Sequence, residues 1–142
     1  MYTADKNEYD SLVKLSVTYL NEGIDHKIFT KLVAKNNLIA TPYYPLYMKT
    51  VRQHFWTSDA NEYNVLRVQL ALFNDGGIDG YIFLNAGVTS SVPLYRLVLN
   101  KTPIHLLTID NNEFDFLVKS ESWTLERRPE NPSGFTGYVM PK

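Results

Sequence analysis

Cysteine is absent from the 142-residue sequence, and no apolar run approaches the length of a membrane span. The first absence excludes disulfides, thiolate metal ligands and cysteine nucleophiles. The second excludes a transmembrane helix, which needs about 20 consecutive apolar residues. The net charge is -1, and the 14 basic and 15 acidic residues are interspersed, so the basic excess of a nucleic-acid binder is also missing. We therefore predict no membrane and no nucleic-acid partner. The polar N-terminus, unlike a signal peptide, favours a cytoplasmic location.

The motifs of common enzymes are missing as well. The sequence holds no GxGxxG, GxxxxGK[ST], HExxH or GxSxG pattern. The three histidines, His26, His54 and His105, are far apart, and none has a carboxylate at the helical spacing of a metal pair. We predict neither a cofactor nor a metal.

The composition is that of a globular protein, with 44% hydrophobic and 20% charged residues. Neither an internal repeat nor a linker is apparent. We therefore predict a single domain over residues 1–142, in which the proline-containing residues 129–142 form an extended C-terminal arm.

Helical spacing of apolar residues predicts two helices in the N-terminal part of the chain. The first covers residues 5–21, and the second runs from an N-cap at Asp25 to residue 37. A short third helix is predicted over residues 49–56. The aromatic segment Tyr43–Met48 lies between the second and third predicted helices. Pro42 and Pro45 make regular structure unexpected there.

Period-two alternation predicts strands in the rest of the chain. They cover residues 65–72, 81–84, 94–99, 104–109 and 114–125, after an earlier short strand at 38–41. Asn74–Gly77 predicts a hairpin turn, and a change of face predicts a β-bulge near Ser120–Ser122. Helices followed by strands favour an α+β fold, with two or three N-terminal helices packed on a curved, mainly antiparallel sheet of five to six strands.

This order of elements resembles the NTF2-like family, including SnoaL-type proteins. Tyr19–Phe29 resembles the family's helix break, Asn37–Pro42 its first strand and Ser122–Arg127 its closing strand. The resemblance covers about residues 5–128 and implies a cone that encloses a pocket. Some members are isomerases, dehydratases or cyclases that use Asp, His and Tyr, and others are binding, dimerisation or assembly modules. A fold of this kind does not by itself choose between them.

Two histidines are candidate catalytic residues, because an imidazole in a pocket can act as a general acid or base. His54 could act as this acid or base, but we favour a structural role at the surface or at a helix end. His105 could also be the base of a pocket, but we favour a histidine that is buried or at a sheet edge with its hydrogen bonds satisfied. Its nearby carboxylates are Asp110, Glu113 and Asp115.

The densest aromatic group is a candidate ligand-binding site or interface, since tyrosine combines apolar area with a polar tip. It contains Tyr43, Tyr44 and Tyr47, with Trp56 close by. The alternative is a loop packed over the core.

Other polar residues have simpler explanations. Asp25 and Asp59 stand where helix caps or turns are expected. The three arginines predicted on strands are assigned to a solvated face, with anion binding as the alternative: Arg67, Arg96 and Arg127.

From these features we predict a non-enzymatic binding or assembly module, homodimeric, with an apolar small molecule or a protein as partner. Its candidate interface is a mixed strand face: Val65, Arg67, Gln69, Ala71 and Phe73. One alternative is a small cofactor-independent isomerase, lyase or hydrolase that acts on an apolar small molecule, with His54 or His105 as the base. Another is an accessory protein of a mobile element, of the phage, conjugation or immunity kind.

Overall fold

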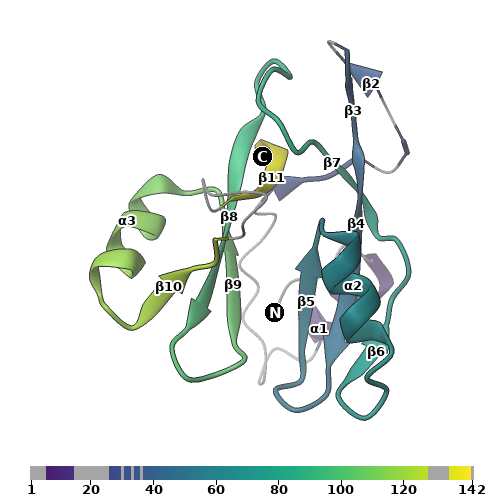
Figure 1. Ribbon diagram of the computed structural model, residues 1–142, viewed down its shortest axis with the longest axis vertical. Coiled ribbons are helices and arrows are strands. Elements are labelled where there is room, and N and C mark those ends of the chain that lie inside the picture. The colour runs from purple at the N-terminus through teal and green to yellow at the C-terminus, as the bar shows by residue number, and fades with distance from the viewer. Residues whose placement is uncertain are drawn as a thin grey trace.

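The structure is a computed structural model that describes residues 6–14, 26–29, 31–32, 34–35, 37–127 and 135–141. Strands dominate it and form a curled half-barrel (Figure 1). The helices are α1 (Lys6–Lys14), α2 (Ala60–Arg67) and α3 (Asn111–Lys119). The strands are β1 (His26–Lys27), β2 (Ala34–Lys35), β3 (Leu38–Ile39), β4 (Thr41–Met48), β5 (Gln53–Thr57), β6 (Phe73–Asp75), β7 (Gly80–Ile82), β8 (Val92–Leu99), β9 (His105–Thr108), β10 (Trp123–Leu125) and β11 (Phe135–Pro141).

Two long strands organise the sheets, and every pairing between the described strands is antiparallel. β4 pairs with β5, β6 and β7, whereas β8 pairs with β9, β10 and β11. β1 pairs with the end of β11, so the C-terminal residues 135–141 lie within a sheet. A bridge between Phe83 and Tyr138 joins the two systems. The predicted antiparallel pairing is thus confirmed.

The predicted α+β arrangement, with two or three N-terminal helices on a five- to six-stranded sheet, is wrong. The structure describes part of the helix predicted over residues 5–21, and this part is α1. The described part of the second predicted helix contains strands β1 and β2 instead. Asp25, its expected N-cap, lies outside the described residues. The third predicted helix is a tight turn followed by β5. Arg52, in the left-handed region at φ 54, reverses the chain there and lets β5 return along β4.

One predicted strand is wrong, and another is wrong in its first half. Residues 65–72 form the end of α2 and a turn. Of the strand predicted over 114–125, residues 114–119 lie in α3 and residues 123–125 form β10. Each helix begins at an aspartate N-cap, Asp59 or Asp110, whose carboxylate accepts two backbone N–H groups of the first turn. These caps outweigh the alternating pattern of the following residues. The expected bulge near Ser120–Ser122 is the end of α3.

The segment with two prolines is strand β4, not an irregular one. Pro45 lies between the parts of β4 that pair with β6 and β7, where its carbonyl accepts the Gly76 N–H at 3.1 Å. No strand needs a donor from residue 45 at this break, so proline is tolerated. The residues Asn74–Gly77 therefore do not close a hairpin, since β6 and β7 both pair with β4.

An internal repeat organises the fold. The first unit (β4, β5 and α2) corresponds at one constant spacing to the second unit (β8, β9 and α3). Identical pairs at this spacing are Pro42 and Pro93, Tyr44 and Tyr95, Leu46 and Leu97, His54 and His105, Thr57 and Thr108, Asp59 and Asp110, Asn61 and Asn112, Glu62 and Glu113, and Leu66 and Leu117. The Asn-Glu-aromatic sequence at the start of α2 and α3 also occurs in α1, at residues 7–9. The expectation of a chain without repeats is therefore wrong.

The local geometry of the two units repeats with their sequence. A threonine Oγ1 accepts the N–H of the capping aspartate at 3.0 Å in each: Thr57 for Asp59, and Thr108 for Asp110. An aromatic pair stacks between strand and helix at 4.2 Å in each: Tyr44 with Tyr63, and Tyr95 with Phe114. Equivalent residues thus fix each helix on its hairpin in the same way.

Three short strand segments meet where the units join. They cover residues 26–29, 80–83 and 137–140. The backbone contacts pass from each segment to the next and return to the first: Phe29 with Tyr81, Phe83 with Tyr138, and Met140 with Lys27. The described segments therefore form a closed triangle at one end of the half-barrel.

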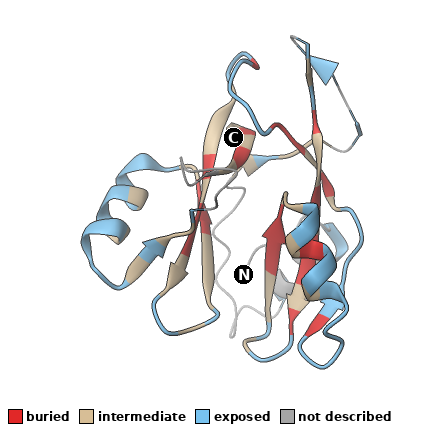
Figure 2. Ribbon diagram, in the orientation of Figure 1, coloured by how far each residue is buried: buried red, intermediate tan, exposed pale blue. Residues whose placement is uncertain are grey.

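The triangle contributes side chains to the main core, which also contains residues of β4, β5, β8 and β9. Ile82 and Val139 are fully buried, and Ile28 packs against them. A Cβ added at Gly80 would lie 2.6 Å from Cδ1 of Ile28, and one at Gly137 would lie 2.6 Å from Cδ1 of Ile82. Glycine is thus needed twice, at equivalent points, for the segments to approach this closely. Figure 2 shows the buried residues gathered on β4, β5 and β8, with α3 largely exposed.

Candidate functional site

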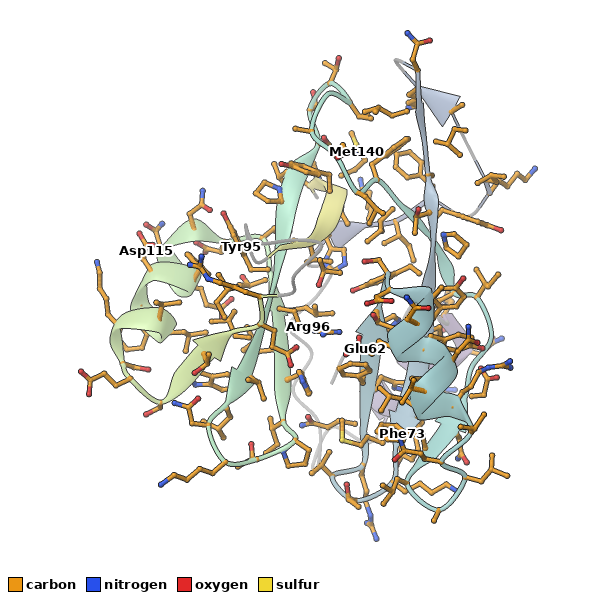
Figure 3. The ribbon with its side chains drawn as sticks, in the orientation of Figure 1. Glu62, Phe73, Tyr95, Arg96, Asp115 and Met140 are labelled. Carbon is orange, nitrogen blue, oxygen red and sulfur yellow. The ribbon has the colours of Figure 1, made fainter. Side chains whose placement is uncertain are left out.

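The charged residue buried most deeply among the described ones is Arg96 on β8, which is only 4% exposed. Its side chain crosses to the first unit, toward α2 (Figure 3). Nη1 donates to the Trp56 carbonyl at 2.9 Å and to Glu62 Oε2 at 3.0 Å, and Nη2 donates to Glu62 Oε1 at 3.2 Å. Nε pairs with the carboxylate of Glu126, just after β10. One cation is thus shared by two carboxylates from different parts of the chain.

The aromatic ring of Phe55 packs against this group of charged side chains. The Arg96 guanidinium lies 4.5 Å from the centre of the Phe55 ring, a favourable cation–π distance. The His105 ring meets the same Phe55 edge-on at 4.7 Å. We call Phe55, Glu62, Arg96, His105 and Glu126 the Arg96 cluster.

His105 completes the Arg96 cluster through both of its ring nitrogens. Nε2 lies 3.2 Å from Glu126 Oε1, and Nδ1 lies 2.9 Å from the carbonyl of Pro103. Both partners are acceptors, so a protonated ring satisfies both contacts and a neutral ring only one.

Glu126 has a perturbed pKa. Burial raises the pKa of this carboxyl, but the hydrogen bond with His105 and the positive charge of Arg96 outweigh burial and hold the pKa below its usual value. Glu126 therefore stays ionised as the counterion of Arg96, and it is not poised as a general acid near neutral pH.

The prediction of a solvated face is wrong for Arg96. Arg96 has the same parity on its strand as Leu94, a buried residue, and this alternation is the signal that could have placed it inside. Arg127 is exposed, and Arg67 lies on α2 with Nη1 3.5 Å from Asp75. The partners of Arg96 could not have been predicted, because they come from two other elements.

A second polar contact joins the first unit to β6. The Tyr63 hydroxyl donates to Asp75 on β6. Burial, and then this hydrogen bond to a carboxylate, raise the pKa of Tyr63. The same hydrogen bond and the Gly77 N–H, at 2.8 Å, lower the pKa of Asp75. This contact attaches α2 to β6.

The structure separates the aromatic group that the sequence suggested. Tyr43, Tyr47 and Trp56 share one face of the β4–β5 hairpin, and Tyr44 lies on the other face, against α2. Tyr43 and Trp56 are buried in the main core, and Trp56 Nε1 donates to Asp79 at 3.0 Å.

The two candidate histidines occupy equivalent positions in the two units but do not meet. His54 packs between the rings of Tyr47 and Trp56, at centroid distances of 5.4 and 5.2 Å. His105 contacts Glu126, which is none of its three expected carboxylates. Asp110 caps α3, as Asp59 caps α2, and the cap predicted at Asp59 is confirmed.

Two kinds of site are absent from the described residues. No three His, Asp or Glu side chains among them are grouped to hold a metal ion. In the same part of the chain, no helix has the length and apolar character needed to cross a membrane.

Of three comparisons with known proteins, one found a match. Neither the curated proteins nor the solved structures contain a match, so the resemblance to the NTF2-like family stays a prediction. A family described as a domain of unknown function, DUF5648, matches residues 1–129. That match spans nearly the whole sequence, and the chain therefore belongs to the DUF5648 family.

Proposed function

We propose that this chain is a non-enzymatic binding module, in which the Arg96 cluster holds two repeated units together and the outer helix faces bind a protein partner. The observation that carries this proposal is the use of Arg96. The guanidinium is buried between the units, and its contacts with Trp56 and Glu62 of the first unit and with Glu126 use four of its five N–H donors. The charged groups therefore serve cohesion rather than proton transfer.

The outer surface supports the second half of the proposal. Val65 on α2 and Phe116 on α3 are 62% and 73% exposed, and they occupy equivalent positions in the two units. Large apolar side chains that remain exposed on a repeated scaffold are typical of surfaces that contact other proteins.

A stability measurement tests whether the Arg96 cluster is structural. We expect Glu62→Gln and Glu126→Gln each to lower the free energy of unfolding by about 1 kcal/mol or more, since each removes a charge that Arg96 needs. Urea titration gives this quantity. Catalytic residues commonly lower the stability of the folded protein. If Glu62 and Glu126 were catalytic, the two variants should therefore be as stable as the wild type or more stable.

Glu113→Gln is the matched control, because Glu113 is the repeat equivalent of Glu62 but is exposed on α3. We expect it to change stability by only a few tenths of a kcal/mol. If the Glu62 and Glu126 variants matched this control, the structural role of the Arg96 cluster, and with it the proposal, would fail.

A further inference from the structure

We propose that copies of this chain associate head to tail, with the α2 face of one copy bound to the α3 face of the next. The proposal rests on the proposed function and names the partner as a second copy of the chain. The α2 face is formed by Val65, Val68, Leu70 and Leu72 with Lys49 and Arg67. The α3 face is formed by Phe116 with Glu113, Asp115 and Glu121.

Both faces combine exposed apolar side chains with charge. Leu70 is 70% exposed in the turn after α2, and Phe116 is the most exposed large apolar residue among those described. The Lys49 side chain reaches the carbonyl of Leu70, which places its ammonium group beside the apolar residues of the α2 face. Removing such side chains from water contributes roughly 25 cal/mol per Å² of apolar area.

The charges of the two faces are complementary. The α2 face carries Lys49 and Arg67, and Arg67 shares its charge with Asp75 at 3.5 Å. The α3 face carries three exposed carboxylates and one exposed lysine, Lys119. A contact between two α2 faces would oppose like charges, and so would a contact between two α3 faces. A contact between unlike faces brings basic and acidic groups together.

The positions of the two faces determine the kind of assembly. α2 and α3 lie at opposite sides of the molecule, and Asp115 points outward from α3 (Figures 1 and 3). One copy can therefore use both faces at once, which produces a ring or an open chain rather than a two-fold dimer. Because each face is small, we expect weak, concentration-dependent association at the low end of specific interfaces.

Sedimentation velocity of the whole chain, over a wide range of concentration and salt, tests this arrangement. We expect oligomers that grow with concentration and dissociate with salt. Leu70→Asp breaks the α2 face and Phe116→Lys breaks the α3 face, and each should weaken association about tenfold or more. Ile39→Lys is the matched control, since Ile39 is 71% exposed on β3, outside both faces.

Mixing the two broken variants gives the sharpest result. Each variant keeps one intact face, so an equimolar mixture should form a one-to-one complex and nothing larger. Circular dichroism checks that each variant is folded. Val68→Asp and Asp115→Lys replace Leu70→Asp and Phe116→Lys, respectively, if either of the first two is unfolded.

The remaining outcomes overturn the inference. If only the α2 variants lost association, the contact would be two-fold symmetric. If Ile39→Lys had an equal effect, the association would be non-specific. A wild-type chain that stayed monomeric throughout would exclude self-association but leave the stability test of the Arg96 cluster, and hence the proposed binding module, standing.

Discussion

The first unit carries Pro45 at the position where the second unit carries Arg96. The neighbouring framework is the same in both, with an aspartate cap, a threonine that supports it and a stacked aromatic pair. Pro45 gives only its carbonyl to the Gly76 N–H, just after β6, and does not reach the second unit. Arg96 reaches the first unit and pairs with Glu62 on α2. The scaffold is therefore repeated, and the connection between units comes from a residue that is not.

The helices differ in the same way. α2 buries Tyr63 and is fixed to β6 through Asp75, whereas α3 buries none of its residues. Glu62 faces Arg96, and its equivalent Glu113 is exposed. One sequence pattern thus serves an internal contact in one unit and an outer surface in the other.

Removal of the cation that joins the units should have the largest effect. We expect Arg96→Met to lower the free energy of unfolding by about 3–5 kcal/mol, because two partly buried carboxylates lose their counterion. Urea denaturation measures the change, and Arg67→Met, which alters an exposed arginine, should cost no more than about 1 kcal/mol. A loss below about 1 kcal/mol for Arg96→Met would mean that the contact between the units does not depend on this charge.

Addition of one methyl group at the triangle of strands should have the next largest effect. Gly80→Ala and Gly137→Ala each place a Cβ 2.8 Å from a backbone carbonyl oxygen, of Phe29 and Phe83 respectively. We expect a loss of about 1–3 kcal/mol from overpacking, similar in the two variants because the sites are equivalent. Thermal unfolding of both tests this equivalence, and Thr89→Ala in an exposed loop is the control. A clear loss in only one variant would contradict it.

Removal of the helix caps compares the units directly. Asp59→Ala and Asp110→Ala should each lower stability by about 1 kcal/mol, since each cap accepts two backbone N–H groups of its helix. We expect the circular dichroism of both variants to remain close to wild type at low temperature, with a lower melting temperature. If only Asp59→Ala is destabilised, α3 contributes little to the cooperative unit.

The smallest expected effect is a pH dependence. The folded state lowers the pKa of Glu126, so its stabilising contribution is complete above the unfolded pKa of about 4.3 and disappears as pH falls through the folded pKa. The stability difference between wild type and Glu126→Gln should therefore shrink in acid. The side chain is a quarter exposed, which limits the size of the effect. A difference that stayed constant from neutral pH to acid would contradict this assignment.

Short-range chemistry was predictable at several points. Asp59 was assigned to a helix cap or a turn and it caps α2, and the alternation of residues 94–99 and 104–109 correctly predicts β8 and β9. The alternation of residues 65–72 gave the wrong element, because it was considered without the cap that precedes it. Pro45 in β4 misled for a different reason: the strand tolerates it where the neighbour of β4 changes from β6 to β7, and pairing is not visible in the sequence.

The Arg96 cluster could be predicted only in part. The parity of Arg96 with Leu94 indicates a buried cation, but its partners Glu62 and Glu126 lie far away in sequence and on other elements. His105 was identified as a candidate, although its partner was not. The repeat could have been found by aligning the two occurrences of Asp-x-Asn-Glu-aromatic, at residues 59–63 and 110–114.

The sequence by itself excludes cysteine chemistry and indicates the cap at Asp59, and it contains the repeated Asp-x-Asn-Glu-aromatic pattern, although no repeat was predicted. These properties depend on residue type and short spacing alone. The tertiary structure decided that Arg96 is shared by Glu62 and Glu126, that Tyr43 and Tyr44 lie on opposite faces, and that α2 and α3 present faces of unlike charge. The physical reason is that burial and charge pairing depend on which segments become neighbours, and strand pairing across the closed triangle determines those neighbours.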